Sequence, residues 1–237
     1  MQTRLSAAAV ASGGDTICVT HTLYNDATSA LRVETLAIPT PVKPIIMITP
    51  GMRKGWVRSA GIIADSVALE WFAATDSASV SAGDSAAPFA YSGVGVLGIV
   101  RYYVRGYVPP PPFDDSVPDL YKARLPIWED SYRNWTIALR PFPTNMTPLG
   151  LVQRLESLTD EACSLGWVAE PGICNSLEAK QRAARRAIER GDLPAACNNI
   201  NALLNEVNGL PDSKIRPEGR SLLRLNAQHL VRMHCGG

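Results

Sequence analysis

The spacing of apolar residues changes near residue 145, and this change constrains the fold more than any other feature of the sequence. Upstream, apolar residues alternate with polar ones in short runs, which is the period of a β-strand. Downstream, they recur every three or four residues, which is the period of a helix with one buried face. The 237 residues are enough for two modest domains. We therefore expect an α+β protein with a β-rich part followed by a helical part.

The first part contains short candidate strands separated by turn residues. The clearest is Thr16–Tyr24, in which alternate residues share one face, and Asn25-Asp26 after it is typical of a turn. Because no helical pattern separates the candidates, we expect residues 15–143 to form an antiparallel β-sandwich. The other candidate strands are Leu31–Ile38, Ile45–Ile48, Val67–Ala73, Ile99–Val108 and Tyr132–Leu139.

Two further segments of this half lack a strand pattern. In residues 1–14, Arg4 precedes an Ala-rich stretch that resembles the end of a secretory signal, so we expect a disordered leader or signal remnant there. Residues 109–126 form a Pro-rich, acidic loop whose four leading prolines favour an extended polyproline conformation. A loop of this length is expected to be functional or mobile.

The helical part contains four candidate helices with recognisable starts. Thr147-Pro148 is typical of an N-cap followed by proline at the first helical position. Asn175 and Glu178 resemble a capping box at the start of the second helix. The third helix is expected to begin at Asp192, after Gly191, and the last one at Pro217. The short connections predict a small antiparallel helical bundle over residues 147–237.

Cysteine usage predicts two disulfides. Four of the five cysteines lie in the last 75 residues, which favours bridges and an oxidising compartment over buried cytosolic thiols. In an up-down-up-down bundle, Cys163 and Cys174 lie at one end, and Cys197 and Cys235 lie at the other. A helix of about 15 residues is roughly 22 Å long, whereas a disulfide needs Cα atoms within about 7 Å. We therefore expect bridges Cys163–Cys174 and Cys197–Cys235, with Cys18 unpaired.

Two stretches of the chain resemble known bacterial sequences. Val80–Ser85, followed by Gly98–Pro109, is similar to a β-sandwich module of secreted bacterial proteins, in which a "PG-(D/E)-S" turn precedes a "YYV-(R/Q)-G" strand. The pairs Asp130-Ser131 and Trp135-Thr136 fit the strand that closes that module.

The second stretch, in the helical part, resembles the FIMAH domain found at the C-termini of many secreted bacterial proteins. The matching segments are Gly172–Lys180, Arg190–Asp192 and Asn201–Val207, and Cys174 stands where alanine is common in that family. This family is an accessory module without an established catalytic role. The resemblance therefore implies export and modularity, and it implies no reaction.

The sequence offers little catalytic or metal-binding chemistry. His229 and His234 are five residues apart on one helix, so we interpret them as polar helix-end residues near a disulfide and not as metal ligands. His21 is interpreted as a core or edge residue. No GxSxG, P-loop or GxGxxG motif is present. We expect no enzyme activity, no cofactor and no metal site.

Acidic and aromatic residues around the Pro-rich loop are the remaining candidates. The acidic residues lack the spacing of a glycosidase or a calcium loop and are interpreted as solvated; they are Asp114, Asp115, Asp119, Glu129 and Asp130. The aromatic residues Trp128, Tyr132 and Trp135 form a candidate ligand platform, because aromatic rings on sandwiches stack on sugars. Packing in the core is the alternative interpretation of these rings.

Charge and hydropathy exclude two further classes of partner. The net charge of +1 creates no general field for nucleic acid. No apolar run approaches the roughly 20 residues of a membrane helix. We expect a non-catalytic structural or interaction protein of a bacterium, secreted or at the cell surface, with a protein or glycan partner. The alternative is a carbohydrate-binding accessory module.

The completeness of the helical pattern leads to a first prediction. We expect a fragment that begins at Thr147 to fold by itself, since the apolar stripes of the bundle are complete. Circular dichroism under oxidising conditions should show a strongly helical spectrum. A spectrum typical of a disordered chain would contradict this prediction.

Overall fold

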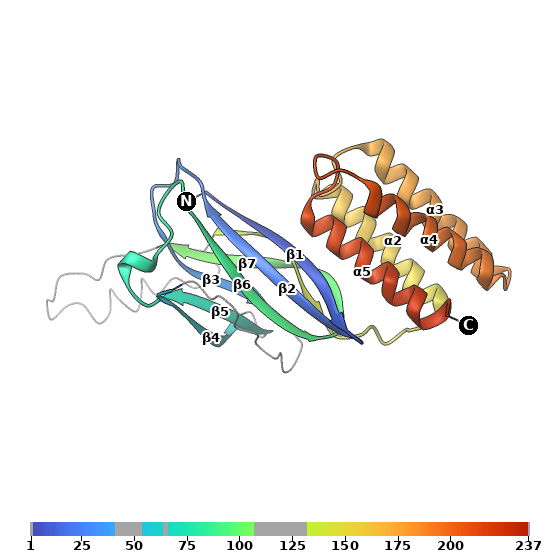
Figure 1. Ribbon diagram of the computed structural model, residues 1–237, viewed down its shortest axis with the longest axis horizontal. Coiled ribbons are helices and arrows are strands. Elements are labelled where there is room, and N and C mark those ends of the chain that lie inside the picture. The colour runs from blue at the N-terminus through green and yellow to red at the C-terminus, as the bar shows by residue number, and fades with distance from the viewer. Residues whose placement is uncertain (1, 41–53, 64–65, 107–131, 237) are drawn as a thin grey trace, which may run out of the picture.

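The computed structural model describes residues 2–40, 54–63, 66–106 and 132–236. The fold is α+β, with a β-sandwich at one end of the molecule and a helical bundle at the other (Figure 1). The expected strand Ile45–Ile48 and the loop 109–126 lie outside the described residues.

The sandwich consists of two antiparallel sheets. Within the described residues, one has the strand order β1-β2-β6 and the other β4-β5-β3-β7-β8. A short 3-10 helix, Asp76–Ala78, precedes β6. The strands are β1 Thr3–Gly13, β2 Thr16–Asn25, β3 Val33–Pro39, β4 Trp56–Ile63, β5 Ser66–Ala73, β6 Ser85–Val94, β7 Val96–Gly106 and β8 Tyr132–Arg140.

Strand β1 corrects the expectation of a disordered leader at residues 1–14. Thr3–Gly13 pairs antiparallel with β2 along its whole length, from Thr3 opposite Asn25 to Gly13 opposite Thr16. Its alternate residues Leu5, Ala7 and Ala9 are buried in the sandwich. The alanines gave this segment no clear strand pattern, because alanine has a low intrinsic preference for β-structure.

The core between the sheets confirms the alternation expected for Thr16–Tyr24. Every second residue of β2 points inward and is buried, from Ile17 to Leu23. Aromatic residues of both sheets meet there: Phe89 on β6 makes edge-to-face contacts with Trp56 and Trp71 of the other sheet. These contacts couple the two sheets through large buried rings.

The other expected strands within the described residues overlap observed ones, with shifted ends. The segments Leu31–Ile38 and Val67–Ala73 correspond to β3 and β5, and Ile99–Val108 and Tyr132–Leu139 correspond to β7 and β8. Strands β4 and β6 were missed. Strand β6 contains Pro88 and Gly93, which normally weaken a strand.

The bundle consists, within the described residues, of α2 Pro148–Ser164, α3 Pro171–Glu189, α4 Leu193–Gly209 and α5 Pro217–His234. The expected cap at Thr147 is confirmed, because its Oγ1 accepts from the Gly150 N–H. Asp192, where the next helix was expected to start, caps α4: its Oδ1 accepts from the Ala195 N–H. The capping box expected at Asn175 is wrong. Helix α3 already begins at Pro171, because proline fits the first turn, where no backbone donor is needed.

Both expected disulfides are present. The Cα atoms are 6.2 Å apart in Cys163–Cys174 and 5.7 Å apart in Cys197–Cys235. Cys18 on β2 is free and half-buried. The bridges close segments with sequence separations of 11 and 38 residues, which corresponds to about 3 and about 4 kcal/mol in a chain-entropy estimate.

His21 occupies the centre of the sandwich and makes its stability depend on pH. The side chain is fully buried, its Nε2 lies 3.1 Å from the Ile137 carbonyl oxygen, and its ring stacks on Tyr91. Burial lowers the pKa of His21 from 6.5 to about 4. The unfolded chain therefore takes up a proton near pH 6.5, whereas the folded chain resists protonation until about pH 4.

We predict that the free energy of unfolding falls as the pH drops from 6.5 to 4, with about 3 kcal/mol of the loss due to His21. The variant His21→Gln retains a donor for the Ile137 carbonyl but does not titrate, so its loss should be smaller by about that amount. Urea unfolding of both proteins at the two pH values measures the difference. Equal losses would show that His21 does not cause the acid sensitivity.

Candidate functional site: the joint between sandwich and bundle

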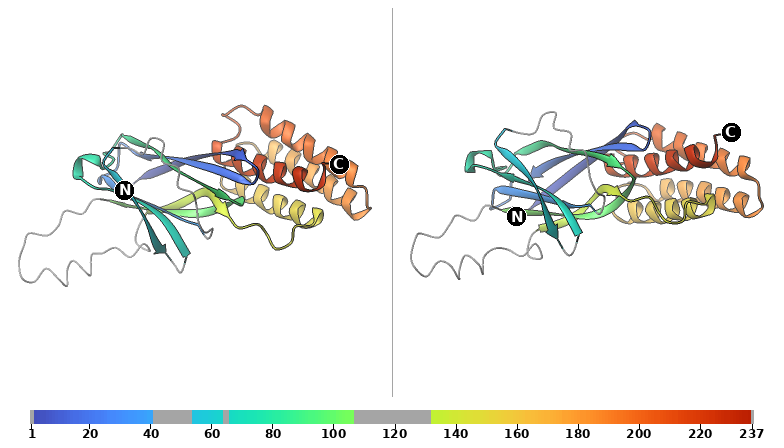
Figure 2. Two further views of the ribbon diagram at one scale, coloured as in Figure 1. Left: turned by 60° about the horizontal axis from the view of Figure 1, so that its bottom comes forward. Right: turned by 90° about the horizontal axis from the view of Figure 1, so that it is seen from below.

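Helix α5 covers the side of the sandwich where the two sheets meet edge to edge. Strands β1 and β8 are edge strands of their sheets, and they contact each other. Helix α5 packs against β1, β7 and β8, and Figures 1 and 2 show it running beside β1. We call this contact region the joint.

Side chains of α5 take the hydrogen-bonding groups that a further strand would use on β1. The Ala7 N–H donates to Glu218 Oε1 at 3.1 Å, and the Ala9 N–H donates to Ser221 Oγ at 2.9 Å. Arg224 Nη2 donates to the Ala9 carbonyl at 3.0 Å. Unpaired groups on a strand edge invite pairing with other chains. The helix thus closes the edge of β1 without adding a strand.

The buried carboxylate of Glu218 is compensated from three directions. The side chain is 1% exposed, which is costly for a charged group unless it is paired. It accepts the Ala7 N–H, and Arg216 Nε lies 3.5 Å from its second oxygen. Glu218 also lies in the first turn of α5, where the helix dipole favours negative charge.

A second set of polar contacts anchors the bundle on β7. The Leu97 carbonyl accepts from Arg154 Nη2 of α2 and from Asn226 Nδ2 of α5, both at 3.1 Å. Asn226 is buried and also donates to the Leu222 carbonyl in its own helix. Two helices therefore converge on a single carbonyl of the sandwich.

Apolar side chains make the joint part of the sandwich core. The bundle residues Leu158, Ala162, Trp167, Leu222 and Leu225 belong to the same buried cluster as the inner residues of both sheets. Gly219 lets α5 approach the loop after α2, because a Cβ there would lie 3.1 Å from Trp167. The rest of the bundle has a second, separate core.

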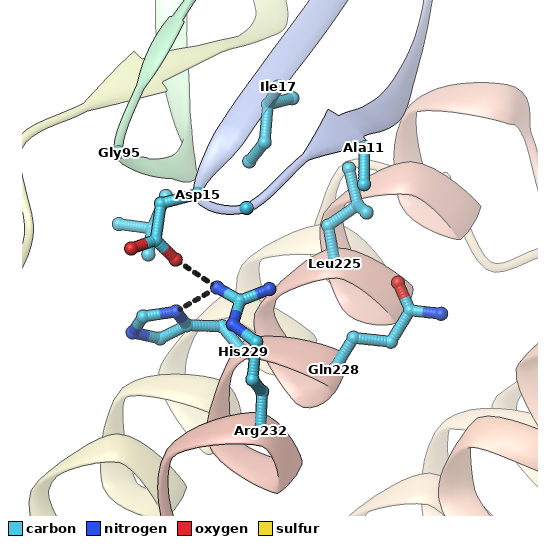
Figure 3. Close-up of a pocket in the computed structure, with 10 residues that line it drawn as sticks. Ala11, Asp15, Ile17, Gly95, Leu225, Gln228, His229 and Arg232 are labelled. Carbon is cyan, nitrogen blue, oxygen red and sulfur yellow. Dashed lines mark hydrogen bonds and ion pairs between the residues drawn. The ribbon is translucent and has the colours of Figure 1, made fainter.

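An ion pair ties the far end of the joint to the turn between β1 and β2. Arg232 Nη2 contacts Asp15 and also approaches His229 Nδ1 at 3.0 Å (Figure 3). A cavity beside them has about 20 Å³ available to water. That is room for about one water molecule, whereas ligand pockets measure about 300–1,000 Å³. The cavity therefore fits a solvent molecule and not an organic ligand.

The two histidines of α5 contact the linker between β8 and α2, which spans residues 141–147. The His229 ring stacks on Phe142 with centroids 5.1 Å apart, and His234 Nε2 lies 2.7 Å from the Met146 carbonyl oxygen. His229 is only 5% exposed. His229 is therefore buried beneath the linker, one to two turns before the end of α5.

The candidate aromatic platform is only partly within the described residues. Trp128 and the acidic residues 114, 115, 119, 129 and 130 lie outside them, and of Tyr132 only the backbone pairing with Val104 is described. Trp135 is half-buried against the sandwich core, and the Arg101 guanidinium lies 4.9 Å from its ring centroid. Trp135 therefore contributes to packing.

A cluster of Ser176, Lys180 and Glu206 resembles a nucleophile with a base. Lys180 Nζ lies 2.9 Å from Ser176 Oγ and 2.7 Å from Glu206 Oε2. Activation of a serine needs an amine that can accept its proton, and an ammonium paired with a carboxylate cannot do so. The cluster links α3 to α4.

The described segments contain neither a cluster of metal-ligating side chains nor a helix that could span a membrane. No group of three or more His, Cys, Asp or Glu side chains there is arranged to hold a metal ion. Likewise, none of the helices in these segments has both the length and the apolar character needed to cross a bilayer.

The amino-acid pattern of α5 does not predict the residues of the joint. On α5, Leu223, Ala227 and Leu230 form the apolar stripe that faces the bundle core, which is the pattern expected of a bundle helix. A second stripe recurs at the same spacing but mixes polar with apolar residues, which does not distinguish it from a solvated face. It consists of Glu218, Leu222, Leu225, His229 and Arg232.

Comparison with known proteins identifies no relative: no family model matches the chain, and no curated protein matches it. The resemblance of the bundle to the FIMAH domain therefore stays a prediction.

The burial of Glu218 predicts that removing its carboxylate lowers the free energy of unfolding. The variant Glu218→Ala leaves the Ala7 N–H without a partner and should lower the free energy of unfolding by about 1–3 kcal/mol. Glu218→Gln retains an oxygen acceptor and should lose less. Glu178→Ala, which removes the exposed pair with Arg182, is a matched control with an expected loss of about 0.3–0.5 kcal/mol. Chemical denaturation measures all three. Equal losses of stability at positions 218 and 178 would contradict the role of Glu218 as the acceptor for the edge of β1.

Proposed function

We propose that the protein is a non-catalytic structural or interaction protein of a bacterium, secreted or held at the cell surface. The observation that carries the proposal is the pair of disulfides in the bundle. Structural disulfides persist in oxidising compartments and are rare where thiols are kept reduced. The predicted resemblance of the two parts to modules of secreted bacterial proteins supports the same location.

The joint supports a structural role. The sandwich and the bundle share one buried cluster and exchange hydrogen bonds at Ala7, Ala9 and Leu97. Two parts joined by a large apolar contact move less against each other than parts joined by a flexible linker alone. The chain thus holds two surfaces at a defined separation, which is what a spacer or an interaction scaffold requires.

Carbohydrate binding is the weaker alternative. Sugar binding on a sandwich needs an open aromatic face. The ring of Trp135 packs against the core, and the Arg101 guanidinium lies over the ring. The alternative would then depend on Trp128, outside the described residues, and on Tyr132, of which only the backbone is described. If it is correct, Trp128→Ala should abolish binding in a glycan array, whereas Trp135→Ala should leave it intact.

The proposed location predicts a specific thiol count. In protein recovered from its native cells, we expect only Cys18 to react with an alkylating reagent after unfolding without reductant, and all five cysteines to react after reduction. The protein should be found in the medium or in the cell-surface fraction. Five reactive thiols in protein from the cytoplasmic fraction would refute the proposed location.

A further inference from the structure

Three segments that are distant in sequence meet at His229. The linker contributes Phe142, whose ring stacks on the imidazole. Helix α5 contributes Arg232, and the β1–β2 turn contributes Asp15, which pairs with Arg232. Figure 3 shows the imidazole and the carboxylate both contacting the same terminal nitrogen of Arg232, Nη2. His229 therefore contacts the linker directly and the β1–β2 turn through Arg232.

The hydrogen bond between Arg232 and His229 requires a neutral ring. A guanidinium only donates, so His229 Nδ1 must accept and the ring proton must lie on Nε2. When the ring takes up a second proton, both of its nitrogens become donors. Two cationic donors then face each other at a separation of 3.0 Å, and the contact changes from attraction to repulsion.

The surroundings of His229 oppose its protonation. The charged and titratable groups that act on it are Arg232 and His234 on α5, Arg154 on α2 and Asp15 in the β1–β2 turn. Burial of the ring is the main cause that lowers its pKa, the cationic groups lower it further, and Asp15 alone acts in the opposite direction. A group with a lowered pKa resists protonation only while its surroundings stay in place.

We infer that His229 is an acid-sensitive latch that holds the linker and the β1–β2 turn against α5. At neutral pH, the uncharged ring accepts from Arg232 and the latch is closed. As the pH falls into the acid range, proton uptake displaces Arg232, weakens its pair with Asp15 and loosens the contact with Phe142. The contacts of α5 with the edge of β1 do not involve His229, so they hold the two parts together while this end opens.

The tautomer and the titration of His229 can be measured directly in the whole protein. Long-range ¹H–¹⁵N correlation spectra at pH 7.5 should show the proton on Nε2 and an unprotonated Nδ1. The midpoint of the titration should lie below that of an unstructured histidine peptide. A proton on Nδ1 at pH 7.5, or a midpoint at or above that of the peptide, would overturn the proposal without any mutation.

Hydrogen exchange tests whether the ring controls the joint. We expect amides of residues 11–17 and 142–147 to lose protection roughly tenfold between pH 7.5 and 5.5, after correction for intrinsic exchange, because a hydrogen bond to a charged group is lost. His229→Gln offers an acceptor that does not titrate, so these segments should then respond little. His234→Gln is the matched control and should retain the response at residues 11–17. An equal response in wild type and His229→Gln would refute the latch.

Discussion

The open backbone edge of β1 is the constraint on which the arrangement of this protein depends. A strand edge with free N–H and C=O groups must be paired, covered or shielded by charge. Strand β1 cannot shield itself, because it carries no charged residue between Leu5 and Gly13. Glu218, Ser221 and Arg224 supply the missing partners from α5. The position of the bundle beside the sandwich follows from this requirement.

Covering an edge and closing a bundle place different demands on one helix. The side of α5 that faces the bundle needs only apolar residues, such as Leu223, Ala227 and Leu230. The side that faces β1 needs polar side chains opposite the free backbone N–H and C=O groups of the strand, with apolar side chains between them. Buried Glu218 and Leu222 are successive members of that second stripe. Helix α5 is therefore buried on two sides, one within the bundle and one against the sandwich.

Local signals made the helices and the disulfides predictable, whereas tertiary contacts decided the rest. The caps at Thr147 and Asp192 act within one turn, and the helix order alone selects the cysteine pairs. Strand β1 has no comparable local signal, because its alanines become a strand only between β2 and α5. The polar stripe at Glu218 and His229 could not be predicted either, since its partners in β1 and in the linker lie more than 80 residues away in sequence.

The kind of bond that holds each region determines the conditions to which that region responds. Both disulfides lie inside the bundle, so they protect its two ends against unfolding but do not cross to the sandwich. Within the described residues, the joint is instead held by the chain itself, by apolar packing and by polar contacts such as Arg232 with Asp15. Packing varies little between pH 7 and pH 5, whereas a contact that depends on a neutral histidine changes in that interval. Acidity therefore acts on the outer end of the joint through His229, whereas the disulfides inside the bundle do not titrate.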